Sequence, residues 1–181
     1  MKATGIVRRI DDLGRIVIPK EIRRTLRIRE GDPLEIFTDR EGKVILKKYS
    51  PIGELGSLAG IYADSLSKTL DCTVCITDTD QVIAAAGNGK KELQETLLSA
   101  ELAEVFQQRK TVLKKSSDAE FVAITKDRSE YSEEIISVIL SEGDIAGGVI
   151  FLQKNEKKHF GEMEKKLSLI HISEPTRRSY I

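Results

Sequence analysis

Apolar and polar residues follow strand-like patterns in three parts of the first fifty residues. Residues 5–11 (GIVRRID) and 14–19 (GRIVIP) have the composition of strands, and the turn-forming letters DDLG join them. Residues 33–49 alternate on both sides of DREGK, which predicts a β-hairpin. We therefore expect two pairs of strands in this part of the chain.

The stretch between these two pairs has the spacing of a helix. Ile22 and Leu26 lie four positions apart in PKEIRRTLRI, and the arginines occupy other positions around the helix. Pro19 suits the first helical position, where its missing N–H group costs nothing. A short amphipathic helix is the prediction.

The pattern changes after Tyr49. Pro51, Gly53 and their neighbours interrupt the strand periodicity, which indicates a domain boundary. We expect a first domain over residues 1–51 and a second over residues 54–166.

The second domain mixes helical and strand-like segments. Its first helix is predicted from the spacing of Leu55, Leu58, Ala59, Tyr62 and Leu66. Further along we expect two strands joined at DTD in residues 72–87, one continuous helix over 90–110, a strand over 119–126 and a hairpin over 133–154. This order predicts an α+β domain around an antiparallel sheet.

Composition places the chain among ordinary globular proteins. Its 181 residues are 40% hydrophobic and 32% charged, enough for one large or two small domains. No apolar run approaches the ~20 residues of a membrane span, and the N-terminus lacks the apolar core of a secretion signal. We expect a cytoplasmic protein that makes no contact with a membrane.

The formal net charge of zero hides an asymmetry between the two domains. Residues 1–50 hold thirteen Lys and Arg against eight Asp and Glu, an excess of five positive charges, and the rest of the chain carries the opposite excess. A basic module on an acidic body indicates a polyanionic partner for the basic part, although a solvated charged face would give the same counts.

The last residues break the pattern of the second domain. Residues 159–167 (HFGEMEKKL) begin a helix, but LSLIHISEPTRRSYI then places β-branched residues and Pro175 where the helix should continue. This segment resembles a translated sequencing adapter. We expect residues 167–181 to be a non-native tail that truncates the last helix, and we give it no function.

Enzymatic chemistry finds little support in the sequence. Cys72 and Cys75 lie three apart in a strand pattern, so their side chains should face opposite sides of a sheet as small core residues. His159 lies in a polar stretch typical of the surface. Residues 87–91 (GNGKK) read either as an anion site at a helix start or as a plain turn, which is the commoner use of this pattern. We predict no metal, cofactor or catalytic residue.

A cluster of arginines surrounds the first turn and the first helix. Arg8 and Arg9 lie on the first predicted strand, Arg15 opens the second, and Arg23 and Arg24 lie on the helix. The planar fork of arginine binds phosphates or guanine edges in a bidentate way. Because residues 1–30 contain no aromatic residue for base stacking, duplex DNA suits this surface better than RNA.

The first domain is so small that it is only marginally stable alone. Its aromatic residues are Phe37 and Tyr49, and a unit of roughly fifty residues usually needs a partner. We expect a homodimer with interleaved strands, which would present two copies of the basic surface at a fixed separation.

Residues 1–51 resemble the AbrB-type swapped-hairpin transcription regulators. The resemblance rests on TGIVR, DDLGR, VIPKEIRRTL, GDPLEI and ILKKY. The longer chain resembles sporulation regulators in which such a domain precedes a GAF domain, here residues 54–166. The resemblance implies regulation of late forespore genes, both up and down, by a DNA-binding dimer whose hairpins are swapped between chains.

The same resemblance implies roles for particular residues and further partners. Arg8, Arg15, Arg23 and Arg24 would make the main contacts with DNA, and Arg9 and Lys20 would make weaker ones. Pairing of GAF domains would give a homotetramer, which depends on the C-terminal helix that the tail truncates here. GAF domains often bind small molecules, but the sequence names neither a ligand nor the operator.

Two alternatives belong to other classes of protein. Antitoxins can share the swapped-hairpin domain, but their toxin-binding segments are usually short, whereas this chain continues into a folded body. Some GAF-fold proteins reduce methionine sulfoxide, which would require an exposed and activated thiolate at Cys72 or Cys75.

Overall fold

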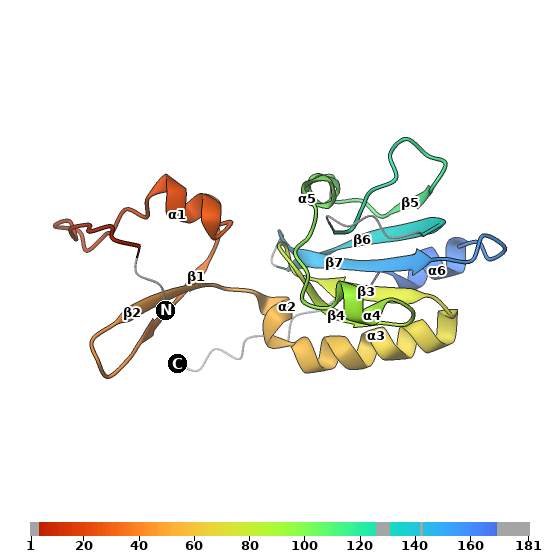
Figure 1. The fold of residues 1–181 in the computed structure, drawn as a ribbon, viewed down its shortest axis with the longest axis horizontal. Helices are drawn as coiled ribbons and strands as arrows, with labels where there is room; N and C mark the ends of the chain where they lie inside the picture. Colours follow the sequence, from red (N-terminus) through yellow and green to blue (C-terminus); the bar gives the residue numbers. More distant parts are fainter. Residues whose placement is uncertain (1–3, 126–130, 142, 170–181) are drawn as a thin grey trace. The chain divides into compact units, whose positions relative to one another are not determined.

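The computed structural model describes residues 4–125, 131–141 and 143–169 (Figure 1). They form two compact units that divide between Tyr49 and Ser50, within the segment where the sequence indicates a boundary. Residues 170–181, most of the expected non-native tail, lie outside the described ranges.

The N-terminal unit contains one helix and one hairpin. Helix α1 spans Lys20–Thr25, and strands β1 (Leu34–Thr38) and β2 (Val44–Lys48) pair antiparallel along their whole length, which confirms the predicted hairpin. The carboxylate of Asp39 accepts two backbone N–H groups in the hairpin turn, both at 2.9 Å. The predicted helix is also confirmed, although Pro19 precedes its first residue instead of being it.

The two strands predicted over 5–11 and 14–19 do not form in the single chain. Only the turn is present: the Gly14 N–H donates to the Asp11 carbonyl at 3.0 Å, and the Asp11 N–H donates to the Arg15 carbonyl at 3.0 Å. Beyond the turn both segments run without strand assignment. Two isolated strands are only marginally stable in water, so further strands would favour a ladder here.

The N-terminal unit lacks a buried core. None of its described residues is buried, and large apolar side chains stay open to solvent, with Val7 at 85%, Val17 at 74% and Ile36 at 66% exposure. A hollow of ≈ 330 Å³ lies among the extended segments, α1 and β2, and its lining is almost entirely apolar. The unit therefore buries much less apolar surface than a stable domain of this size needs.

The C-terminal unit is built on a five-stranded antiparallel sheet, as predicted. The strands lie in the order β4-β3-β7-β6-β5. They span Thr73–Thr77 (β3), Val82–Ala86 (β4), Val112–Lys115 (β5), Glu133–Ser141 (β6) and Asp144–Gln153 (β7).

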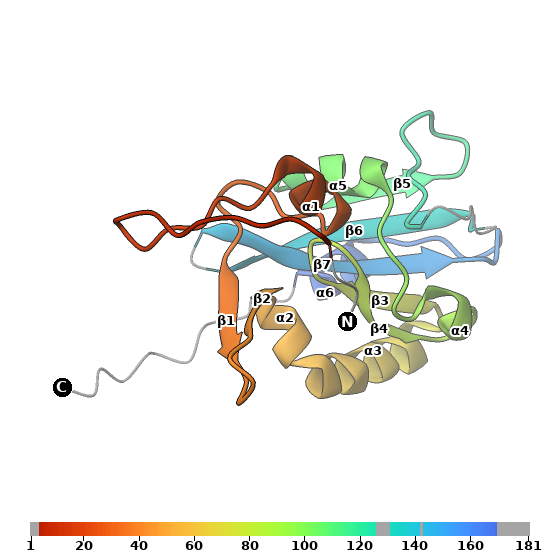
Figure 2. The ribbon, with the colours of Figure 1, turned by 60° about the vertical axis from the view of Figure 1, so that its left-hand side comes forward.

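Helices cover both faces of this sheet (Figure 2). Helices α2 (Pro51–Glu54), α3 (Gly56–Leu70) and α6 (Glu162–Leu167) pack against one face through a core that includes Ile135 and Phe151. Helices α4 (Lys90–Leu93) and α5 (Ala100–Gln107) belong to the core of the other face. Within the described residues, no helix is both long and apolar enough to span a bilayer.

The continuous helix predicted over 90–110 is wrong. The chain leaves α4 and bonds the edge of β4: the Glu95 N–H donates to the Val82 carbonyl at 3.0 Å, and the Val82 N–H donates to the Thr96 carbonyl at 2.9 Å. Ser99 then caps the start of α5. Hydrogen bonding to the sheet edge thus outweighs helical periodicity in this segment.

The strand predicted over 119–126 is also displaced. Its described part runs without a ladder except for one bridge, between Leu98 and Thr125. The edge strand of the sheet is β5 instead, which pairs with β6 from Val112 opposite Ile136 to Lys115 opposite Glu133.

Helix α3 forms as predicted but buries a different face. The small residues Ala59 and Ala63 face the sheet and are buried. The large apolar residues Leu58, Ile61 and Tyr62 remain 49%, 66% and 56% exposed. An apolar stripe is left on the outer side of this helix.

Candidate nucleic-acid interface and ligand cavity

Asp11 holds Arg15 in position at the first turn. One carboxylate oxygen of Asp11 accepts the backbone N–H groups of Leu13 at 3.0 Å and Arg15 at 2.7 Å, and the other accepts Nε of Arg15 at 2.8 Å. These bonds, the backbone N–H of Arg15 foremost, lower the pKa of Asp11 below its usual value. The Arg15 side chain stays 69% exposed, so it can still donate to an anion.

Sequence reasoning passed over Asp11 as a functional residue. The available signal was an aspartate four residues before an arginine across a turn, since aspartate side chains often bond the backbone of their own turn.

Helix α1 carries three of the predicted cations. Lys20 and Arg24 are exposed, whereas Arg23 is half-buried. The Nε atom of Arg23 is buried and has no hydrogen-bond partner among the described residues. A buried donor without an acceptor is costly, so an acceptor from beyond the described residues would stabilise Arg23.

Arg8 and Arg9 lie on the extended segment before the turn, and both are exposed. Arg8 borders the apolar hollow, and its guanidinium makes a long contact of 3.4 Å with the Val7 carbonyl. The stem of Arg8 thus meets apolar surface while its head remains free to bind an anion.

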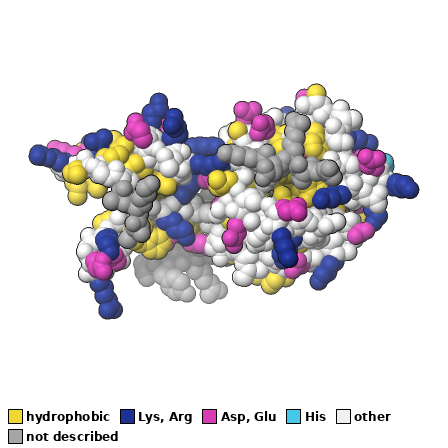
Figure 3. Space-filling model, in the orientation of Figure 1, with side chains coloured by type: hydrophobic (Ala, Val, Ile, Leu, Met, Phe, Trp, Pro, Cys, Tyr) yellow, Lys and Arg dark blue, Asp and Glu magenta, His cyan; other side chains and the backbone are white. Residues whose placement is uncertain are grey.

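All six predicted cations therefore lie within one short region of the N-terminal unit. Figure 3 shows basic side chains gathered over α1 and the adjoining loop, beside exposed hydrophobic side chains of the same unit. Against these six cations residues 8–24 hold three carboxylates, Asp11, Asp12 and Glu21, and Asp11 is paired with Arg15. The surface has the chemistry to bind phosphate groups.

The cysteines of the C-terminal unit face opposite sides of its sheet, as expected from their spacing. Cys72 belongs to one core cluster and Cys75 to the other. Burial, reinforced by neighbouring acidic groups, raises the pKa of Cys72 to about 12, and burial likewise raises that of Cys75 to about 12. Neither thiol is a nucleophilic thiolate at neutral pH.

His159 does more than the sequence indicates. Its Nδ1 lies 2.6 Å from a carboxylate oxygen of Glu133, and the backbone N–H of Phe160 donates to the other oxygen at 2.7 Å. Burial opposes ionisation of Glu133, but these bonds and the nearby charge of Lys115 outweigh it and lower its pKa. His159 therefore anchors the segment before α6 to β6.

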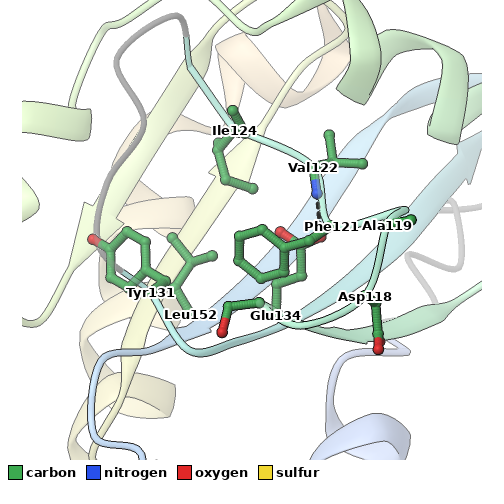
Figure 4. A pocket seen from close by; sticks show the side chains of 10 residues that line it. Asp118, Ala119, Phe121, Val122, Ile124, Tyr131, Glu134 and Leu152 are labelled. Carbon is green, nitrogen blue, oxygen red and sulfur yellow. Dashed lines mark hydrogen bonds between the residues drawn. The ribbon is translucent and has the colours of Figure 1, made fainter.

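A cavity of ≈ 400 Å³ opens on the other face of the sheet (Figure 4). Phe121, Val122, Ile124 and Tyr131 contribute to its wall, and Glu134 of β6 lines it as well. Sequence reasoning missed Glu134. The signal was a pair of acidic residues opening a strand that is otherwise apolar.

Fold and site together define a two-unit protein, in which a basic, hairpin-containing unit suited to nucleic acid precedes an α+β unit built on a five-stranded sheet. Residues 54–171 match the family model described as stage V sporulation protein T C-terminal, transcription factor. The chain is 52% identical over 170 residues to stage V sporulation protein T of Bacillus subtilis (strain 168), covering 92% of each chain. The chain belongs to the stage V sporulation protein T family.

Other comparisons concern single units. Residues 7–54 match a model described as antidote-toxin recognition MazE, bacterial antitoxin. The solved N-terminal DNA recognition domain of Bacillus subtilis AbrB is 65% identical over 28% of this chain and 94% of that one, with a TM-score of 0.25. A type II free methionine-R-sulfoxide reductase from Thermoplasma acidophilum has a TM-score of 0.51 at 12% identity, covering 65% of this chain and 86% of that one. The last likeness shows the fold alone.

Proposed function

We propose that this protein is a sequence-specific transcriptional regulator of late, forespore-type sporulation genes that acts in the cytoplasm on duplex DNA. The observation that carries the proposal is the group of six cations around the first turn and α1. A relative 65% identical in this region is described as a DNA recognition domain. In this proposal Arg8, Arg15, Arg23 and Arg24 make the main contacts, and Arg9 and Lys20 make weaker ones.

The DNA-binding form is a homodimer. The N-terminal unit exposes its apolar residues, borders an apolar hollow and leaves two extended segments without a ladder. A second copy is complementary to these features, because its own extended segments can complete the sheet and fill the hollow. The dimer then carries each arginine twice.

The experiment is a double substitution, Arg23→Ala with Arg24→Ala. DNA selected from a random pool by the wild-type protein serves as the probe, and fluorescence anisotropy measures affinity. We expect the double variant to lose specific binding while its circular dichroism spectrum is unchanged. Arg40→Ala, an exposed arginine in the turn between β1 and β2, is the matched control and should bind normally. An unchanged midpoint in the double variant would refute the assignment.

Pairing of C-terminal units into a homotetramer extends the proposal. The outer stripe of α3, with Leu58, Ile61 and Tyr62 exposed, is an apolar surface suited to burial against a second copy. A tetramer would bring two DNA-binding dimers together and raise their joint affinity by effective concentration.

The cavity of the C-terminal unit supports a further role in binding a small molecule. Its volume falls within the range of ligand pockets, and it combines apolar walls with a buried polar group. Binding there would give the regulator a chemical input.

An antitoxin is the second candidate, supported by the match of residues 7–54 to an antitoxin model. The described residues between 50 and 169 form a folded unit instead of a short extended tail, which favours the regulator. Co-purification of a stoichiometric toxin from the native host would reverse this preference.

A further inference from the structure

Glu134 lines the cavity, and one of its carboxylate oxygens has no hydrogen-bond partner among the described residues. Glu134 is 0% exposed, and its Oε1 accepts the backbone N–H of Val122 at 2.9 Å (Figure 4). Its Oε2 is buried and has no hydrogen-bond partner among the described residues. A buried acceptor in this state favours any cavity occupant that brings a donor.

The charges around Glu134 do not neutralise it. Lys114, the nearby cation, is ion-paired with Glu120. The described lining contains two acidic residues, Asp118 and Glu134, and no lysine or arginine. Burial accordingly raises the pKa of Glu134 to about 7, against the lowering effects of the Val122 N–H and Lys114. The wall therefore disfavours the binding of an anion and favours the binding of a cation.

The remaining wall is apolar and partly aromatic. Phe121 and Tyr131 contribute rings, and Ile124 and Leu152 contribute aliphatic surface. The Tyr131 ring already makes a cation–π contact, because Nζ of Lys154 lies 5.2 Å from its centroid. Such a wall fits a flat ring better than a long polar chain.

We propose that the cavity binds a small aromatic or heteroaromatic molecule with a protonated amine or amidine group, which donates to Oε2 of Glu134. This inference rests on the proposed small-molecule role of the C-terminal unit. The ligand supplies the missing donor and its positive charge compensates the carboxylate, while its ring packs on the apolar wall. Any proton held by Glu134 passes to solvent on binding, so affinity rises with pH through neutrality.

The experiment uses three probes that share one ring and differ in charge: benzamidine (cationic), benzamide (neutral) and benzoate (anionic). Each is titrated into the full-length protein, and the amide signal of Val122 is followed by NMR. We expect benzamidine to bind more tightly than benzamide by about tenfold, because a hydrogen bond to a charged group is stronger than a neutral one. Benzoate should not bind.

Two variants separate the role of Glu134 from general effects. Glu134→Gln keeps the shape and an acceptor for Val122 but loses the charge, and should reduce benzamidine binding to the level of benzamide. Glu104→Gln, which removes an exposed carboxylate on α5, is the control and should bind benzamidine like the wild type.

Three results would overturn the inference. Equal binding of all three probes would show a cavity without charge preference, which contradicts the ligand class but preserves a small-molecule role. Benzamidine binding to Glu134→Gln with the wild-type affinity would likewise contradict the ligand class and preserve a small-molecule role. No binding of any probe would contradict the small-molecule role itself, whereas DNA binding, measured separately, would be unaffected.

Discussion

Asp11 and Glu134 are carboxylates in opposite electrostatic situations. Asp11 is solvated and accepts three hydrogen bonds that favour its charged form, so it serves as a fixed anchor for Arg15. Glu134 is buried with one oxygen unpaired, so its charged form is disfavoured. The arginines were readable from sequence because their charge and spacing are local properties. The unpaired state of Glu134 was not, because it depends on how residues 116–124 fold over β6.

The burial of Glu134 predicts a particular dependence of stability on pH. Its folded pKa of about 7 lies above the ordinary glutamate pKa of 4.5, so between these pH values the folded state holds a proton that the unfolded state has lost. The free energy of unfolding should therefore fall as pH rises from about 4.5 to about 7, by at most ~3 kcal/mol, and then level off.

Urea unfolding at several pH values, compared between the wild type and Glu134→Gln, measures this effect. The variant should lose the decline between these pH values and keep the rest of the profile. A wild-type profile that matches the variant throughout would show that Glu134 titrates normally.

At the scale of elements, the sequence pattern identified helices and hairpins well where the contacts are local. The hairpins of β1 with β2 and β6 with β7, and helix α3, all form as their periodicity predicts. The sequence pattern failed to predict the structure where different segments compete for hydrogen bonds, as in the break between α4 and α5 at the edge of β4. It also failed over residues 5–19, where two strand-like segments form no ladder of hydrogen bonds within one chain.

The outer stripe of α3 yields a prediction about assembly. A charge at Ile61, which is 66% exposed, should oppose burial of this stripe against a second copy while leaving the core intact. We expect Ile61→Glu to convert a tetramer into a dimer of half the mass in sedimentation velocity. Gln107→Glu, the same charge at an exposed position on α5, should remain tetrameric. A tetramer that persists in Ile61→Glu would place the contact elsewhere.

In the whole molecule, the two units differ in the sign of their net charge and in how much of each is buried. The basic N-terminal unit has cations but no buried core among its described residues, and the acidic C-terminal unit has two cores, one on each face of its sheet. In the proposed dimer a second copy of the chain covers the apolar surface of the first unit, and its cations bind a polyanion. Dimerisation and DNA binding are expected to be linked, because dimerisation doubles the cations presented.

The salt dependence of DNA binding tests whether these arginines form the DNA-binding surface. Each phosphate contact contributes about −0.9 to the slope of log affinity against log salt. In a symmetric dimer one substitution removes two such contacts, one in each protomer. Anisotropy titrations over a range of salt concentrations should therefore show a steep slope for the wild type and, for Arg24→Ala, weaker binding with a slope flatter by about 1.8. Unchanged affinity and slope in Arg24→Ala would contradict a DNA surface built from these arginines.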